Sequence, residues 1–257
     1  MHIVSITTDF GLQDYYVAEL KAHILKRSTD IQLIDVSHSI DSHDIVQAAH
    51  FLDNVFRSFP VGTIHLVAVY NYYDKNSSFI LVEREGHFFI GPDNGVFSLI
   101  FEDLSVEDVV LLDRPEIENT SIAEMFGWTV GMIIDGKPKE EIGSKMQSIN
   151  QKMGIKPVVT SSQIRATIIH IDHYENVIIN LKRDQFEKIR CGRDFQLYYK
   201  QTDPVTRISE DYADVPITDV MCLFNSAGYM EIGINMGKAS SMLNLKKNET
   251  IQINFLD

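Results

Sequence analysis

The sequence is poor in cysteine, with only Cys191 and Cys222 among 257 residues. The two have neither CxxC spacing nor an extracellular context, so a disulfide framework or a cysteine-held metal is not expected. We therefore expect both thiols to be reduced and the protein to be cytoplasmic.

Basic residues are also few, with 23 Lys and Arg against 36 Asp and Glu and a formal net charge of −13 at pH 7. A surface this negative repels a phosphate backbone, and no block of Lys or Arg is present to overcome the repulsion. Nucleic acid is therefore not an expected partner.

Long apolar runs are missing as well, and the longest are far shorter than a membrane span requires. The first residues, MHIVSITTDF, lack the basic leader, apolar core and small-residue cleavage site of a secretory signal. With 44% apolar and 23% charged residues, the chain is typical of a globular protein that associates with no membrane.

Several familiar site motifs are absent, namely GxGxxG after the first strand, GxxxxGK(S/T), HExxH and GxSxG. The nine histidines lack the spacing of metal ligands. His170 and His173 lie near Asp172, but neighbouring strand residues point to different faces of a sheet. We expect no metal site and no resident cofactor.

What the sequence does contain, up to about residue 145, is an alternation of strand-like and helix-like segments. Strands are predicted at 3–10, 31–38, 63–70, 78–85, 87–93 and 106–113, and helices at 12–28, 44–59 and 121–134. Strands that alternate with amphipathic helices indicate an α/β domain with a mainly parallel sheet, which we place at 1–145.

The pattern changes in the polar segment SKMQSINQKMGIKPVVTSSQ, which suits an inter-domain linker at 146–162. Beyond it, only strand-like runs occur, at 164–172, 176–182, 194–200, 220–226, 229–235 and 249–257. Short strands at close spacing favour a small antiparallel barrel or sandwich. We predict an all-β barrel domain at 163–257.

A carboxylate stands at the end of the first predicted strand, in TTDFGLQDYY. Ligands of open α/β sheets bind beyond the carboxyl ends of the strands, where Asp9 would lie and where Gly11 permits a tight turn. A carboxylate there can accept hydrogen bonds from both hydroxyls of a ribose. Asp9 or Asp14 could instead cap the next helix, and for Asp14 neither interpretation is favoured.

Three further stretches contain polar residues. IGPDNGVF is strong turn chemistry that needs no ligand to explain it. In IDHYENVIIN, Asp172, Tyr174 and Asn176 alternate, which predicts that they share one strand face. That face could be solvated, or it could form a pocket for a planar polar molecule. Ser226, in the predicted hairpin turn of FNSAGYMEIGIN, is ambiguous by itself.

Five segments in order resemble the S-adenosylmethionine (SAM) hydroxide adenosyltransferases, adenosine-forming SAM hydrolases related to the SAM-dependent fluorinase and chlorinase. They are TTDFGLQDYYVAELK, DVSHSIDSHDIVQAAHFL, GPDNGVFSLI, IDHYENVIIN and NSAGYMEIGINMGKAS, and they extend from Thr7 to Ser240. The resemblance implies an α/β domain, a C-terminal β-barrel, and a homotrimer that binds SAM between neighbouring subunits.

The resemblance also implies roles for individual residues. Asp9 would hold the ribose hydroxyls, and Asp14 and Tyr16 would lie close to the substrate. The remaining predicted substrate-binding residues are those of the barrel, with Asn94 from the α/β domain: Asn94, Asp172, Tyr174, Asn176, Asn225 and Ser226.

The family's catalytic positions are substituted in this chain. In the hydrolases an Asp, an Arg and a His prepare the attacking water, and an ungapped alignment from His65 to Glu83 places Tyr70 at the Asp position. The same alignment places Ser77 and Ser78 at a pair of arginines, and Ser121 stands where the His would be. Asp74 and Lys75 offer replacement charges, whereas Tyr72 and Tyr73 are equally explained as surface aromatics of a trimer contact.

The resemblance implies displacement at C5′ of the SAM ribose, with methionine leaving as a neutral thioether that needs no general acid. We predict hydrolysis to adenosine and methionine, with Tyr70 and Ser77, Ser78 or Ser121 positioning the nucleophile. The alternative is a non-catalytic protein that binds SAM or adenosine. A halogenase is less favoured, because its halide-binding loop is not reproduced here.

Overall fold

The computed structural model describes residues 1–72, 77–113, 121–200 and 203–256. The chain forms two compact units, Met1–Gly154 and Ile155–Asp257. Among the described residues, every helix is too short or too polar to span a bilayer.

The first unit is built around a sheet with strand order β2-β1-β3-β5-β4-β6-β7. Its strands are β1 His2–Thr8, β2 Ile31–Ser37, β3 Ile64–Ala68, β4 Phe79–Arg84, β5 His87–Pro92, β6 Val109–Leu112 and β7 Gly143–Lys145. Its helices are α1 Tyr16–Leu25, α2 Ile45–Val55, α3 Val96–Ile100, α4 Ile122–Ile134 and α5 Lys139–Ile142.

The prediction of a mainly parallel sheet is wrong for half of the strand pairs. Strands β2, β1, β3 and β5 are parallel, but β4, β6 and β7 pair antiparallel. A two-residue turn joins β4 to β5, and both of its residues, Glu85 and Gly86, have positive φ. A turn this short can join only antiparallel strands, so the sheet is mixed.

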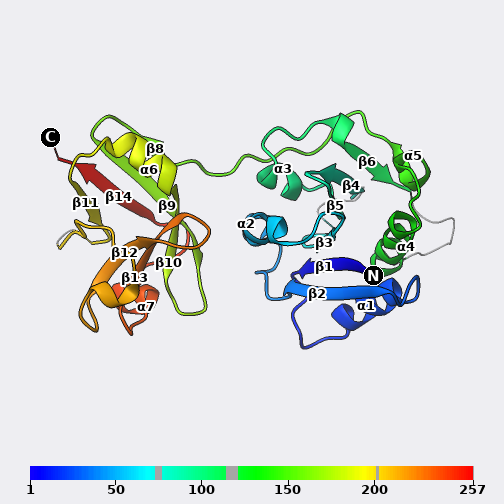
Figure 1. The fold of residues 1–257 in the computed structure, drawn as a ribbon, viewed down its shortest axis with the longest axis horizontal. Coiled ribbons are helices and arrows are strands. Elements are labelled where there is room, and N and C mark those ends of the chain that lie inside the picture. The colour runs from blue at the N-terminus through cyan, green and yellow to red at the C-terminus, as the bar shows by residue number, and fades with distance from the viewer. Residues whose placement is uncertain (73–76, 114–120, 201–202, 257) are drawn as a thin grey trace. The chain divides into compact units, whose positions relative to one another are not determined.

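Helices cover both faces of this sheet (Figure 1). On one face, Leu20 and Ile24 of α1 and Phe126 of α4 join the core that includes Ile6 and Leu66. On the other face, α2 and α3 pack on residues of β3, β4 and β5. Helices α1 and α4 approach closely at Gly127. A Cβ added there would lie only 2.6 Å from the backbone oxygen of His23.

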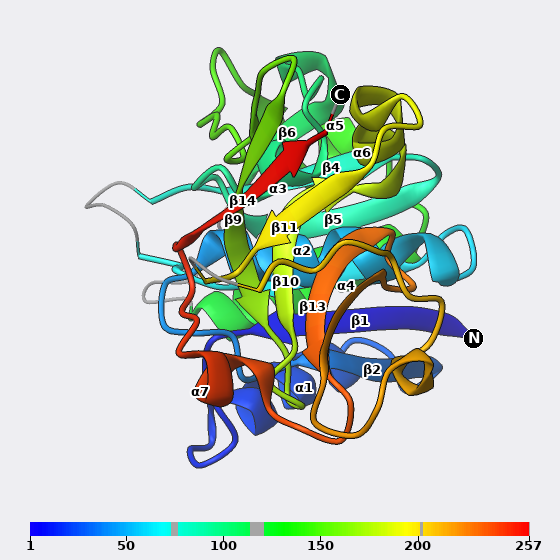
Figure 2. The same ribbon diagram turned by 90° about the vertical axis from the view of Figure 1, so that its left-hand side faces the viewer.

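The second unit is an antiparallel sheet of order β11-β14-β9-β10-β13-β12, with β8 paired to β9 (Figure 2). Its strands are β8 Val158–Val159, β9 Gln163–Ile171, β10 Val177–Lys182, β11 Phe195–Tyr198, β12 Val220–Phe224, β13 Tyr229–Ile234 and β14 Thr250–Phe255. Helices α6 Arg183–Arg190 and α7 Ala239–Leu243 lie near opposite ends of the sheet, so the unit is not purely β.

The predicted barrel is a curled half-barrel. The edge strands β11 and β12 are bridged by one short segment, 205–208, which we call the strap. Val205 pairs with Leu197 of β11, and Ile208 pairs with Cys222 of β12. The core of this unit includes Phe186 of α6. The sequence of this helix is otherwise strongly polar, and the helix was not predicted.

The prediction that Asp172, Tyr174 and Asn176 share a strand face is wrong. Strand β9 ends at Ile171 and β10 begins at Val177, so 172–176 is a hairpin loop. Glu175 has φ 65°, a left-handed conformation that extended strands exclude.

Candidate functional site

Asp9 follows β1 directly, at the edge of the sheet where the parallel strands end. Its Oδ2 accepts hydrogen bonds from the backbone N–H groups of His43 (3.0 Å) and Tyr70 (3.2 Å). No described residue donates a hydrogen bond to Oδ1, although the side chain is only 9% exposed. A fixed carboxylate with one unused oxygen is suited to accept hydroxyl groups from a ligand.

His43 and Tyr70 both have left-handed backbones, with φ of 68° and 53°. Their rings pack together with centroids 4.9 Å apart, and the His43 Nδ1 lies 3.8 Å from the Asp9 carboxylate. Non-glycine residues in this region are uncommon and concentrate where surrounding structure holds a functional site. The Asp9 carboxylate thus organises two strained residues from loops that follow β2 and β3.

Asn94 fixes the backbone at Tyr70. Its Nδ2 donates to the carbonyl oxygens of Val69 (3.0 Å) and Tyr70 (3.2 Å), and its Oδ1 accepts from the Val96 N–H. Its amide is therefore used by the backbone. Next to it, Asp93 accepts from the Asn150 N–H, and burial raises the pKa of this carboxyl group.

A cavity of about 400 Å³ brings together Tyr16 and Ser121, two of the predicted site residues. Phe10 and Asn71, the immediate neighbours of Asp9 and Tyr70, line it as well. The Asn71 Oδ1 is buried and has no hydrogen-bond partner among the described residues. The Ser121 hydroxyl accepts from the Glu124 N–H at 3.1 Å and so caps α4.

The other predicted residues of this unit are more scattered. Ser77 and Ser78 immediately precede β4, and the Ser78 carbonyl accepts from the Asp93 N–H at 2.9 Å. Asp14 is exposed in the loop before α1. Asp74 and Lys75 lie outside the described residues.

In the second unit, Asp172, Asn176 and Asn225 belong to one hydrogen-bonded network. The Asp172 carboxylate accepts from the backbone N–H (2.8 Å) and the Nδ2 (3.1 Å) of Asn176. The Tyr212 hydroxyl donates to Glu231 Oε1 at 2.5 Å, and the Asn225 Nδ2 donates to Glu231 Oε2 at 3.3 Å. This network closes both the 172–176 loop and the hairpin between β12 and β13.

Glu231 is a carboxylate in an apolar strand, 3% exposed, and its burial raises its pKa. Burial and the Glu231 carboxylate also raise the pKa of Tyr212, so the phenol stays a donor. Tyr174 and Ser226, in contrast, lie exposed on loops and make no hydrogen bond to this network.

Sequence reasoning missed His43, Asn71, Tyr212 and Glu231. For His43 an indication existed, because it follows the second parallel strand at the edge that identified Asp9. For Glu231 the indication was a charge inside the apolar run YMEIGIN. No comparable feature of the sequence distinguishes Asn71 or Tyr212. Within the part of the chain that the structure describes, no group of three His, Cys, Asp or Glu side chains could hold a metal.

Two family models match the chain. The SAM hydroxide adenosyltransferase N-terminal domain matches residues 4–143, and the C-terminal domain of the same family matches residues 166–252. The chain therefore belongs to the SAM hydroxide adenosyltransferase family.

The relatives that align over nearly the whole chain include both SAM hydrolases and fluorinases. The (R)-S-adenosyl-L-methionine hydrolase of Methanocaldococcus jannaschii is 26% identical, over 98% of this chain and 96% of its own. The fluorinase of Actinopolyspora mzabensis is 23% identical over the same shares. A crystal structure of an uncharacterized conserved protein from Thermotoga maritima superposes with a TM-score of 0.85 at 25% identity, covering 98% of this chain and 99% of that one.

Proposed function

We propose that this protein cleaves SAM at C5′ by nucleophilic displacement, with water as nucleophile and adenosine and methionine as products. The Asp9 carboxylate carries the proposal, because it stands at the ligand-binding edge of the sheet with one oxygen fixed and one unused. Family membership over both domains and relatives named as SAM hydrolases support the same reaction.

In this reaction a water oxygen bonds to C5′ while the C5′–sulfonium bond breaks. Methionine departs as a neutral thioether, and the water loses one proton to a base or to solvent. Asp9 would hold the ribose hydroxyls, and positioning the sugar in line with the water contributes most where no strong base is present. Asp14 and Tyr16 would lie beside the substrate.

The nucleophile side is proposed to be formed by Tyr70, with Ser77, Ser78 or Ser121. No described residue forms a hydrogen bond with the Tyr70 hydroxyl, so that hydroxyl could orient a water molecule. The Ser121 hydroxyl, which lines the 400 Å³ cavity, keeps its own proton available while it accepts from Glu124.

The second unit is proposed to supply Asp172, Tyr174, Asn176 and Ser226 to the methionine and adenine ends of the substrate, together with Asn225. Asn94 completes the set by fixing the backbone of Tyr70. We further propose a homotrimer that binds SAM between neighbouring subunits and needs no metal.

The test is incubation of the purified protein with SAM, followed by chromatography for adenosine and methionine. We expect adenosine from the wild type and none above background from Asp9→Ala. The matched control is Asp53→Ala, which removes a half-buried partner of the exposed Arg57 and should form adenosine at the wild-type rate. Equal product from Asp9→Ala and the wild type would contradict the role of Asp9.

One observation favours the non-catalytic alternative, namely that the described residues that line the 400 Å³ cavity include no Lys, Arg or His, and Glu19 is the one charged group among them. SAM binding that Asp9→Ala weakens, with no product after long incubation, would establish a SAM- or adenosine-binding protein. If turnover occurs, Tyr70→Phe should reduce it, and unchanged turnover would remove Tyr70 from the mechanism. Added chloride or fluoride that yields a 5′-halogenated nucleoside would identify a halogenase.

A further inference from the structure

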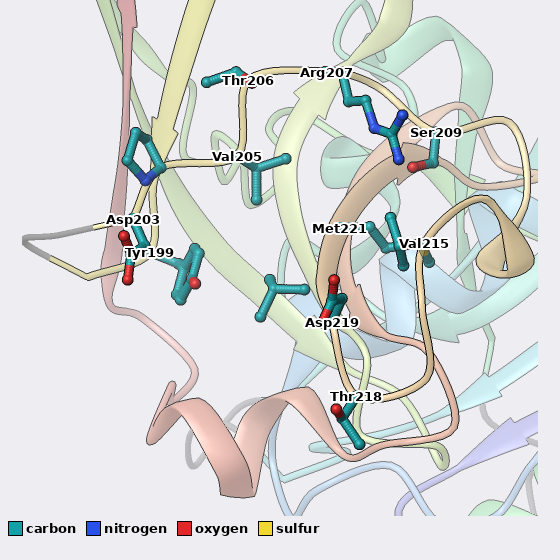
Figure 3. A pocket seen from close by; sticks show the side chains of 12 residues that line it. Tyr199, Asp203, Val205, Thr206, Arg207, Ser209, Val215, Thr218, Asp219 and Met221 are labelled. Carbon is teal, nitrogen blue, oxygen red and sulfur yellow. The ribbon is translucent and has the colours of Figure 1, made fainter.

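A second cavity, of about 550 Å³, lies within the second unit between the strap and the loop that precedes β12 (Figure 3). This volume is within the range of small-molecule sites, about 300–1,000 Å³. None of the predicted site residues lines it.

The two ends of this cavity differ in chemistry. Arg207 and Ser209 lie together at one end, and Asp219 lies across from them (Figure 3). One Arg207 Nη donates to the Asp214 carbonyl at 2.8 Å, which fixes the guanidinium, while its other N–H groups have no partner among the described residues. The Asp219 carboxylate likewise forms no hydrogen bond or ion pair with a described residue. Donors for an anion therefore face an acceptor for a cation.

Ser209 indicates that this end of the cavity is arranged to bind a ligand. This residue is buried, 4% exposed, and no described residue forms a hydrogen bond with its Oγ. A buried hydroxyl without a partner costs about 1–3 kcal/mol, so such groups in native proteins usually have a water or ligand partner.

Much of the remaining cavity surface is apolar. Val205 of the strap, Val215, Val220 and Met221 line it. The apolar side chain of a ligand would be desolvated here. At the far end, Asp203 lies beside Tyr199, whose pKa is raised by burial and by the Asp203 charge.

We propose that this cavity binds a free α-amino acid with an apolar side chain, as the zwitterion. Its carboxylate pairs with Arg207 and accepts from Ser209, its ammonium pairs with Asp219, and its side chain lies on the valines and Met221. An Arg–carboxylate pair is charge-assisted and directional, which selects this end for the carboxylate. The proposal does not depend on the SAM reaction.

The test is calorimetric titration of the full-length protein with L-norleucine and two matched analogues. Pentylamine has the same side chain and amine but lacks the carboxylate, and hexanoate lacks the amine. We expect norleucine to bind at least tenfold more tightly than either analogue. Equal affinity for norleucine and pentylamine, or no binding of norleucine at all, would overturn the proposal.

Variants locate the site. Arg207→Gln and Asp219→Asn should each weaken norleucine binding at least tenfold, as expected for loss of a hydrogen bond to a charged group, about 1.5–3 kcal/mol. Asp219 is exposed, so its variant is expected to fold even if loss of the Arg207 bond to Asp214 disturbs the loop. The controls are Arg165→Gln, an exposed arginine elsewhere in this unit, and Asp9→Ala, and both should bind norleucine normally. Undiminished binding in Arg207→Gln and Asp219→Asn would show that the amino acid binds elsewhere.

Discussion

The two units both bury polar side chains among apolar ones, but the buried groups differ in charge. In the first unit, Ser5 Oγ lies 2.6 Å from His65 Nδ1, and His65 Nε2 lies 3.2 Å from His87 Nδ1. Burial, and then the neighbouring His87, lowers the pKa of His65 to about 3, so this network is neutral. In the second unit the buried group is the Glu231 carboxyl, whose pKa is raised by burial.

The difference teaches that acid acts in opposite directions on these two buried networks. Folded His65 resists a proton that the unfolded chain accepts below pH 6.5, so the His65 network destabilises the first unit in acid. Folded Glu231 accepts its proton at a higher pH than the unfolded chain does, so its protonation opposes acid unfolding of the second unit. Measurements of the stability of each unit can therefore test this comparison.

The largest expected effect is acid destabilisation of the first unit. The His65 contribution is present above pH 6.5 and is lost as the pH falls toward 3, by an amount on the order of several kcal/mol in full. His87, whose pKa is also lowered by burial, acts in the same direction. Urea unfolding followed by fluorescence of Trp128 in α4, the sole tryptophan, reports this unit at each pH.

The control for this prediction is His65→Asn, which cannot take up a proton in this pH range. It should flatten the dependence of unfolding free energy on pH between 6.5 and 4, whatever its stability at pH 7. An unchanged slope would assign the acid sensitivity to other groups.

The next effect concerns the second unit. Tyr212→Phe removes the donor to Glu231 Oε1 and leaves a buried carboxylate short of one hydrogen bond, which should cost about 1–3 kcal/mol. Amide hydrogen exchange in β13, which contains Glu231, measures the loss. Tyr174→Phe alters an exposed phenol and should change exchange by less than about 0.5 kcal/mol. Equal effects of the two variants would mean that the network does not stabilise this unit.

Ser121 tests an exposed polar group of the first unit, for comparison with its buried network. Ser121→Ala should lower stability by about 1 kcal/mol through loss of the α4 cap, at acid and neutral pH alike. Ser121→Asp retains a capping oxygen and should restore the Trp128 unfolding midpoint. If turnover occurs and falls in both variants, Ser121 also acts on the substrate, because the capped variant isolates that role.

The smallest effect is expected at Glu175, a partly exposed carboxylate of the second unit. Hydrogen bonds from Lys238 and Ser241 lower its pKa to about 2. A lowered carboxyl pKa contributes stability above pH 4.5 that is lost as the pH falls toward 2, the opposite of Glu231. The stability difference between the wild type and Glu175→Gln should therefore shrink on acidification, measured by hydrogen exchange of the 172–176 loop. A difference that grows in acid would contradict the ion pair.

The periodicity of the sequence was sufficient for the long amphipathic helices and for most strands. Helix α4 begins at Ile122, one residue after the predicted start of the 121–134 helix, and Ser121 caps it. Strand direction was not encoded in the same way, because β4 and β5 are apolar on both faces whether their neighbours are parallel or antiparallel. Helix α6 was missed because only Phe186 among its eight residues is buried.

For the candidate site, position at a strand end was informative and side-chain pattern was not. Asp9 was identified from its place after β1, and the structure surrounds it with His43 and Tyr70. The alternation of Asp172 and Asn176 suggested a strand face, yet the two meet through a loop whose left-handed Glu175 no spacing rule reveals. Contacts such as Tyr212 with Glu231 depend on how separate segments of the chain pack together. Local patterns in a single sequence do not determine that packing.

The strap has a consequence for how the second unit behaves among other copies of itself. Strands β11 and β12 end the sheet, and an uncovered edge strand is a template for pairing with another chain. Val205 and Ile208 each occupy one of these edges. A change that loosens this short segment would expose both edges together and favour their pairing with other copies of the chain. Because Val205 and Arg207 also line the proposed amino-acid cavity, an occupied cavity would protect the protein from self-association without altering any strand.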